Sequence, residues 1–147
     1  MFHFNHKFVI IAGCGNFGAI LAQKLTSEGT AVAILDINGK SFDKLPVEVK
    51  DLAVEADATD MDVLIDAGIK NADAVVAVTS NDNTNIMIAE IAKMIFNVKT
   101  VVVKLFDIRK ETAFEGSDIW IISPALLSVN EFEKILNHDK SEVEKCM

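Results

Sequence analysis

The sequence predicts an α/β protein of the Rossmann type, with a doubly wound parallel sheet and helices on both of its faces. Three observations carry this prediction. Short apolar runs rich in β-branched residues alternate with amphipathic helical patterns along the chain, which is typical of βαβ units. The runs are continuously apolar, as in strands that are buried on both faces. A glycine-rich turn at residues 13–18 lies between the first run and the first helical pattern, where dinucleotide-binding proteins carry one.

Six of these runs are predicted strands, and the default order for a doubly wound sheet of this kind is 3-2-1-4-5-6. They span residues 8–12, 31–35, 51–55, 74–78, 101–104 and 119–122. The first predicted helix carries its apolar stripe on Phe17, Ile20, Leu21 and Leu25. Gly29 closes that helix, a second helix is centred on Leu64, and the longest spans residues 86–96 after a run of capping residues.

A further amphipathic pattern follows Pro124, with Val129, Phe132, Ile135 and Leu136 on its apolar side. We therefore assign residues 1–136 to one domain that includes this helix. The charged residues 137–147 form a tail that we expect to fray.

The charge of the chain restricts its partners. A net charge of −8 gives a surface that repels nucleic acids and anionic lipids. A phosphate-bearing ligand therefore has to be held locally, by backbone N–H groups.

No apolar run approaches the roughly 20 residues of a membrane span, so a role at a membrane requires a partner. The two cysteines, Cys14 and Cys146, are expected to be reduced thiols of a cytosolic protein.

The glycine turn has a physical role for each of its three glycines. Gly13 permits the tight turn, Gly15 lets the backbone approach a pyrophosphate, and Gly18 lets the helix pack close to the sheet. The N–H groups and partial positive charge of the helix N-terminus then favour phosphate. An ordinary glycine turn is the alternative, and the strand–turn–helix context makes it the weaker one.

Asp36 ends the second predicted strand, where an acidic residue of such a site hydrogen-bonds the adenosine ribose. Its charge repels a 2′-phosphate, and the next residues, Ile37 and Asn38, supply no arginine. The sequence therefore favours NAD over NADP, while ATP, which has the same free ribose diol, stays possible. A solvated loop aspartate is the alternative.

Two further loops begin at the predicted carboxyl edge of the sheet. Asp57 and Ala58 follow the third strand, where an adenine would lie, and Thr79 and Ser80 follow the fourth, at the switch point. Each pair is equally compatible with a helix cap. Lys104 ends the fifth strand; it either faces the crevice, where it would neutralise a phosphate, or is solvated.

The sequence shows no catalytic or metal-binding set of residues. It has no tyrosine, so it lacks the Tyr-Lys pair of short-chain reductases, and the nucleotide fold leaves no length for a substrate domain. Cys14 at a helix N-terminus would be a stabilised thiolate, but a position between two glycines needs only a small residue. These absences disfavour a dehydrogenase; a small NAD-dependent oxidoreductase that completes its site with another chain stays the alternative.

Together with the glycine turn and Asp36, further residues make the chain similar to a known family over residues 7–127. The shared pattern includes residues 56–60, 64–68, 71–73, 76–79, 82, 84, 85, 104 and 122–124. The chain resembles the N-terminal nucleotide-binding lobe of the regulator-of-potassium-conductance (RCK) family, also called the KTN or TrkA-N domain. The stretch over residues 77–96 is most similar to the NAD-binding component of Trk-type potassium uptake systems.

The resemblance implies a set of ligand contacts. Gly13, Cys14, Gly15, Asn16 and Phe17 would contact the ligand, Asp36 would hold the ribose, Asp57 and Ala58 would border the adenine, and Thr79, Ser80 and Lys104 would reach the ribose-phosphate side. The resemblance also implies a non-enzymatic, cytoplasmic regulatory subunit that binds NAD(H). It would lie beneath a membrane potassium transporter or channel as a homodimer or a ring of dimers, whose shape the nucleotide changes. An ATP- or ADP-responsive gating ring of the same family is the alternative.

The chain departs from the family pattern in three places. Asn16 and Ala56 stand where many relatives have arginine and glycine, and the missing arginine charge disfavours an extra phosphate. The usual C-terminal lobe is absent, which fits a stand-alone short member, a partner of another subunit or one lobe of a longer protein. The helix after Pro124 resembles the crossover helix through which such lobes pair, so Phe132 and Leu136 either seal a homodimer or cover their own domain.

Overall fold

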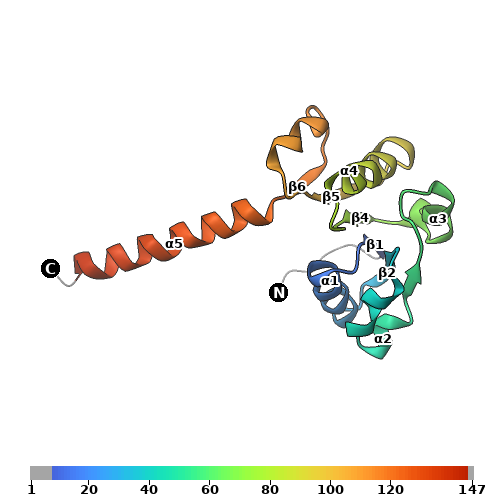
Figure 1. Cartoon of the computed structure of the whole chain (residues 1–147), viewed down its shortest axis with the longest axis horizontal. Helices are drawn as coiled ribbons and strands as arrows, with labels where there is room; N and C mark the ends of the chain where they lie inside the picture. The colour runs from blue at the N-terminus through green and yellow to red at the C-terminus, as the bar shows by residue number, and fades with distance from the viewer. Residues whose placement is uncertain (1–7, 146–147) are drawn as a thin grey trace.

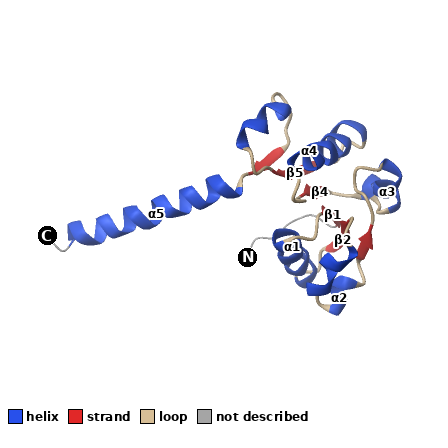
Figure 2. Cartoon of the chain, viewed as in Figure 1, coloured by secondary structure: helices blue, strands red, loops and turns tan. Residues whose placement is uncertain are grey.

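The computed structural model describes residues 8–145, with side chains as far as residue 140. This part of the chain forms a parallel six-stranded sheet in the order β3-β2-β1-β4-β5-β6, with helices on both faces (Figure 1 and Figure 2). The predicted fold class and strand order are thus confirmed. Cys146 lies outside the described residues.

The strands lie close to their predicted positions. They are β1 (Phe8–Ala12), β2 (Ala31–Asp36), β3 (Ala53–Glu55), β4 (Ala74–Ala77), β5 (Thr100–Lys104) and β6 (Trp120–Ile122). β1 is central: its Ile11 is in register with Ile34 of β2 on one side and with Val76 of β4 on the other. Because all six strands run parallel, their carboxyl ends share one edge of the sheet.

The helices between the strands differ more from their predicted positions than the strands do. The helical elements are α1 (Asn16–Ser27), η1 (Gly39–Lys44), α2 (Val47–Lys50), α3 (Met61–Asp66), η2 (Ile69–Asn71), α4 (Asp82–Glu90), η3 (Ile91–Ile95), η4 (Ile108–Phe114) and α5 (Pro124–Lys145). η1, η2 and η4 are 3₁₀ helices, and η3 is a π-helical extension of α4. The helix predicted over residues 86–96 therefore begins earlier, because the side chain of Asn81 caps it by accepting a hydrogen bond from Thr84 N.

α1 buries only part of the apolar stripe predicted for it: Leu25 is buried and Leu21 packs against the core. Phe17 and Ile20 are 39% and 67% exposed. The buried residues of the helix are Gly18, Ala19, Ala22 and Leu25. Small residues are needed here because a Cβ at Gly18 would overlap the carbonyl oxygen of Gly13. The start of the helix therefore packs on the sheet by close approach of the backbones rather than through large side chains.

The sheet has a hydrophobic core on each face, as a doubly wound sheet requires. Ile10 and Ile11 are neighbours in β1 and fully buried, yet they belong to different cores, because successive strand residues point to opposite faces. α1 covers the core that contains Ile11, and α4 covers the other through Ile88 and Ala89.

A buried carboxamide joins the carboxyl ends of β4 and β5 to α4. Asn85 is fully buried, and its Oδ1 accepts hydrogen bonds from Thr79 N at 2.8 Å and Thr79 Oγ1 at 2.6 Å. Its Nδ2 donates to the carbonyl oxygens of Thr79 at 3.1 Å and Lys104 at 3.0 Å. The side chain thereby uses both donor hydrogens and both acceptor lone pairs of its amide, which fixes the loop after β4 relative to the end of β5.

α5 extends away from the sheet as a single helix (Figure 1). Every side chain from residue 125 to residue 140 is exposed. The helix thus does not cover its own domain, contrary to one of the two expectations for it. It continues to Lys145 in place of the frayed tail that the charged sequence predicts, while the division of the chain at residue 136 stays a prediction. Neither α5 nor any other helix of the described residues is long and apolar enough to cross a bilayer.

Replacing Asn85 with alanine is expected to lower the free energy of unfolding by about 2–4 kcal/mol, because buried N–H and C=O groups lose their partners. Urea denaturation followed by circular dichroism measures this change. Asn83→Ala is the matched control: Asn83 is exposed on the same helix and accepts one hydrogen bond, from Lys110 Nζ at 3.1 Å. This control is expected to lose less than about 0.5 kcal/mol. Equal losses in the two variants would contradict the role assigned to Asn85.

Candidate functional site

A cavity of about 360 Å³ opens at the carboxyl edge of the sheet, among the loops that follow β1, β2, β3 and β4. Its wall is formed by Gly13, Cys14, Gly15, Leu35, Asp36, Ile37, Asn38, Ser41, Lys44, Ala56, Asp57, Ala58, Thr79, Ser80, Asn81, Thr84 and Ile88. In doubly wound sheets, ligands bind at this edge, where the strand order reverses between β1 and β4. The cavity therefore lies where the fold predicts a ligand site.

The cavity brings together most of the predicted site residues. Those in its wall are Gly13, Cys14, Gly15, Asp36, Asp57, Ala58, Thr79 and Ser80, whereas Asn16, Phe17 and Lys104 are not part of it. Other wall residues are not among those predicted from the sequence, in particular Asn38, Ser41 and Lys44 around η1 and Asn81, Thr84 and Ile88 around α4. No sequence signal identifies the first group: its spacing of three residues suits a 3₁₀ helix, but a helix of six residues is too short for a recognisable period.

Two different constraints act on the glycine turn between β1 and α1. Gly13 has a φ of +113°, and a Cβ there would lie 2.7 Å from Thr79 N, so backbone conformation and packing both require glycine. A Cβ at Gly15 meets no protein atom within 4 Å, although Gly15 lines the cavity. Packing therefore does not require glycine at position 15, and its absence of a side chain suits a ligand that approaches the backbone closely.

α1 starts at the cavity without a capping side chain. Its N-cap is Gly15, and its first turn contains no acidic residue. The N-termini of η1, α3, α4 and η4 are by contrast capped by the side chains of Asn38, Asp60, Asn81 and Asp107. The first N–H groups of α1 and the positive end of its dipole are therefore available to an anion such as a phosphate.

Asp36 is held in position by backbone donors from two segments. Its Oδ2 accepts a hydrogen bond from Cys14 N at 2.8 Å, and its Oδ1 accepts one from Asn38 N at 2.8 Å. The residue is half-buried and lines the cavity. Each carboxylate oxygen keeps a lone pair for a further donor such as a ribose hydroxyl. The geometry thus fits the ribose contact predicted for Asp36, and the contact itself stays a prediction.

The loops after β3 and β4 use their polar side chains for local hydrogen bonds. Asp57 Oδ1 accepts hydrogen bonds from Thr59 Oγ1 at 2.7 Å and Thr59 N at 2.9 Å, which hold the pKa of Asp57 below its usual value. Thr79 is bonded to Asn85 as described above. Both Asp57 and Thr79 therefore stabilise their own loops while they line the cavity.

Cys14 is unsuited to nucleophilic chemistry. Its side chain is fully buried, and Sγ donates a hydrogen bond to the carbonyl oxygen of Ser41 at 3.4 Å. Burial raises the pKa of the Cys14 thiol; the charge of Lys44 lowers it to a smaller extent, and the charge of Asp36 adds to the rise. The thiol therefore stays protonated at neutral pH, which makes it a poor nucleophile.

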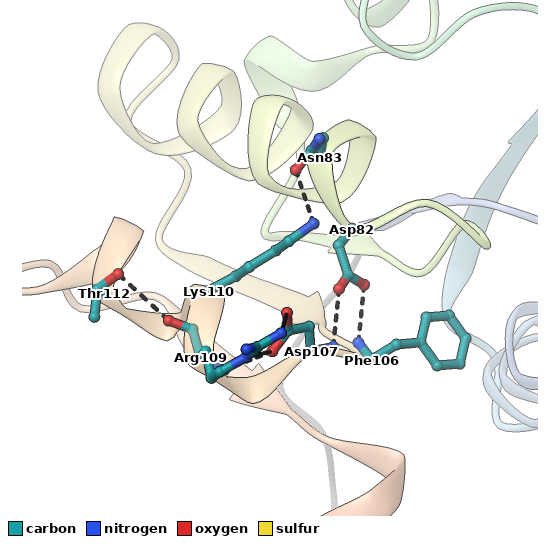
Figure 3. A network of polar contacts seen from close by, with 7 residues as sticks. All are labelled: Asp82, Asn83, Phe106, Asp107, Arg109, Lys110 and Thr112. Carbon is teal, nitrogen blue, oxygen red and sulfur yellow. Dashed lines mark hydrogen bonds and ion pairs between the residues drawn. The ribbon is translucent and has the colours of Figure 1, made fainter.

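Lys104 lies outside the cavity wall, next to a segment that α4 holds in place. Its Nζ stands over the ring of Phe106, 4.9 Å from the centroid. Partial burial lowers the pKa of Lys104, while the charge of Asp82 raises it. The Asp82 carboxylate accepts hydrogen bonds from Phe106 N at 2.8 Å and Asp107 N at 2.9 Å (Figure 3). A contact between Lys104 and a ligand stays a prediction.

Comparison with known proteins finds relatives that are named as Trk system potassium uptake proteins. The family model of the TrkA-N domain matches residues 9–123. The Trk system potassium uptake protein TrkA of Streptomyces coelicolor is 36% identical over 107 residues, which are 73% of this chain and 48% of that protein. The TrkA homologue of Pyrococcus abyssi is 38% identical over 108 residues, which are 74% of this chain and 48% of the homologue. The chain thus spans about half the length of these curated relatives.

Solved structures agree with the fold. The GsuK channel bound to NAD has a TM-score of 0.73 at 23% identity, over 93% of this chain and 24% of that chain. GsuK bound to ADP has a TM-score of 0.73 at 23% identity, over 90% of this chain and 34% of that chain. Likeness at this level of identity supports the fold alone.

Cys14 is expected to react with iodoacetamide at least about tenfold more slowly than a solvated cysteine at about pH 8, because the thiol is buried and its pKa is raised. Mass spectrometry of a Cys146→Ser variant follows the reaction at Cys14 alone. The same variant unfolded in urea supplies the reference rate for a solvated thiol. A native rate equal to the unfolded rate would contradict the burial of Cys14.

Proposed function

The chain belongs to the TrkA-N domain family, and on this premise we propose that it binds NAD(H) in the cavity described above and serves as a non-enzymatic regulatory subunit of a potassium uptake system. One observation carries the proposal: a single cavity combines the glycine turn, the uncapped start of α1 and the Asp36 carboxylate. Because the chain spans about half of its curated relatives, the activity and partners of the whole assembly belong to the proposal.

Each part of a dinucleotide has a matching group in the cavity. The pyrophosphate would be held by the first N–H groups of α1, beside Gly15. The adenosine ribose would donate its hydroxyls to Asp36. Apolar surface for the adenine is supplied by Ile37, which lines the cavity although it is 74% exposed, and by the buried Ala58.

The charges in the cavity wall favour NAD over ATP. Among the described residues, Lys44 is the only lysine or arginine in the wall, while Asp36 and Asp57 are both acidic. Asn16, at the start of α1, adds no charge. A triphosphate carries more negative charge than the pyrophosphate of NAD and therefore gains less in this cavity. ADP or ATP is the alternative ligand, since GsuK structures with NAD and with ADP share the fold.

A regulatory ligand acts through a difference in its affinity for two conformations. In this protein the loop after β4 carries Thr79 in the cavity wall, and Asn85 connects that residue to the end of β5. β5 pairs with β6, which leads directly into α5. A movement of the cavity wall on ligand binding would therefore be transmitted to α5 through the hydrogen bonds of Asn85 and the paired strands β5 and β6.

α5 supplies the surface for self-association in this proposal. Its apolar stripe consists of Leu126, Val129, Phe132, Ile135 and Leu136, which are 45–59% exposed. Two such stripes packed together bury apolar surface that a single helix leaves in water. The resulting homodimer, or a larger ring built from it, would be positioned at the cytoplasmic face of the membrane by a potassium transporter or channel.

Asp36→Ala is expected to weaken NADH binding about tenfold or more, because a hydrogen bond to a charged group contributes about 1.5–3 kcal/mol. Calorimetric titration with NADH, NAD, ADP, ATP and NADPH at one salt concentration measures the affinities, and wild-type protein is expected to bind NADH or NAD most tightly. Asp66→Ala is the matched control, because Asp66 is an exposed carboxylate on α3 outside the cavity wall.

Three outcomes of these titrations would change the proposal. Unchanged NADH affinity in Asp36→Ala would contradict the ribose assignment. A wild-type preference for ADP or ATP would keep the family and replace NAD(H) sensing by adenylate sensing. Steady turnover of the nicotinamide cofactor by the purified chain would contradict a purely regulatory role.

Phe132→Asp is expected to shift the protein from dimer to monomer, because it removes an aromatic contact and places a charge in an apolar interface. Sedimentation velocity over a concentration series measures the association. Lys134→Asp puts the same side chain on the other side of α5, where only an exposed ion pair with Glu131 is lost, and it should associate as wild-type protein does. Wild-type protein that stays monomeric over the whole series would argue against the dimer.

A further inference from the structure

The 3₁₀ helix η1 and its N-cap present one polar face to the cavity. Asn38, Ser41 and Lys44 are spaced three residues apart. Because a 3₁₀ helix has three residues per turn, the side chains of Ser41 and Lys44 lie above one another, and Asn38 precedes them as the N-cap. All three residues line the cavity, and we call them the η1 stripe.

The hydrophobic core holds η1 in a fixed orientation. Phe42 and Leu45, each next to a member of the η1 stripe, are both 6% exposed and belong to the same buried cluster as Cys14. Asn38 caps the helix, since its Oδ1 accepts a hydrogen bond from Lys40 N at 3.1 Å. The η1 stripe is therefore carried by an anchored element rather than by a free loop.

The η1 stripe offers hydrogen-bond donors that the protein itself does not use. Within the described part of the chain, no residue accepts a hydrogen bond from Asn38 Nδ2, Ser41 Oγ or Lys44 Nζ. An amide, a hydroxyl and an ammonium group on one face form a donor set that suits the oxygens of a phosphate monoester.

The η1 stripe adjoins the carboxylate proposed to hold the adenosine ribose. Asn38 N and Cys14 N donate to the two oxygens of Asp36. Cys14 Sγ donates to the carbonyl oxygen of Ser41, and the charge of Lys44 lowers the pKa of the Cys14 thiol. The unused donors are therefore next to the ribose hydroxyls that Asp36 would bind.

We propose that the η1 stripe binds a phosphate monoester on the adenosine ribose, so that the cavity accepts NADPH as a second ligand besides NADH. This inference rests on the nucleotide site proposed above. The Asp36 charge opposes such a phosphate, but its two oxygens each accept a backbone hydrogen bond and Lys44 supplies a compensating charge. NADPH consequently binds more weakly than NADH, and its remaining affinity depends on Lys44.

Calorimetric titration of the full chain with NADPH and NADH tests this proposal through Lys44→Gln. The variant is expected to lose about fivefold in NADPH affinity and less than about twofold in NADH affinity, since an exposed charge pair contributes up to about 1 kcal/mol. Lys40→Gln is the matched control and should leave both affinities unchanged, because Lys40 is an exposed lysine of the same helix outside the cavity wall. Ser41→Ala should lower NADPH affinity in the same direction as Lys44→Gln.

The titrations distinguish failure of this inference from failure of the proposed function. Equal losses for NADH and NADPH in Lys44→Gln would place Lys44 on the part common to both ligands and overturn the η1 stripe as a phosphate site. Wild-type protein that binds NADH and not NADPH would overturn it as well. Wild-type protein that binds neither dinucleotide would overturn the proposed function itself. Circular dichroism establishes that each variant is folded.

Discussion

The buried carboxamide of Asn85 is the interaction on which the arrangement of this molecule depends. One side chain binds the backbone and hydroxyl of Thr79 and the last carbonyl of β5. Asp82, one turn earlier on the same helix, fastens the backbone just after β5 in a similar way. A single short helix thereby aligns the carboxyl ends of two strands, and the cavity wall takes its shape from that alignment because buried, fully paired polar groups tolerate little movement.

The strands, the glycine turn and the position of Asp36 could be predicted from the sequence because their signals are local. A continuous apolar run indicates a buried strand, and Gly13 occupies a backbone conformation that few other residues adopt. The orientation of η1 could not be predicted in the same way. Lys44 faces the cavity because Phe42 and Leu45 are buried in the core, and a six-residue 3₁₀ helix has no α-helical period to reveal that arrangement.

α1 and α5 show two ways in which an apolar stripe fails to predict burial. On α1, Phe17 and Ile20 stay exposed because close approach to the sheet selects the small residues Gly18 and Ala22. On α5 the stripe exists, but no part of the described chain covers it. Hydrophobic periodicity thus identifies a helix and its amphipathic character, whereas the burial of a given face depends on which neighbour the fold provides.

α5 also has a mechanical property that follows from its length and from the way it is attached. The buried Ser123 holds its first turn, accepting hydrogen bonds from Leu126 N at 3.3 Å and Leu127 N at 3.0 Å. The 22 residues of the helix extend about 33 Å at the usual rise per residue. On a lever arm of that length, a rotation of about 5° at the base displaces the far end by about 3 Å. Under the proposed regulation, a rearrangement of the cavity wall that is small beside an atomic radius would thereby be magnified into a displacement that separates or joins side chains at the tip.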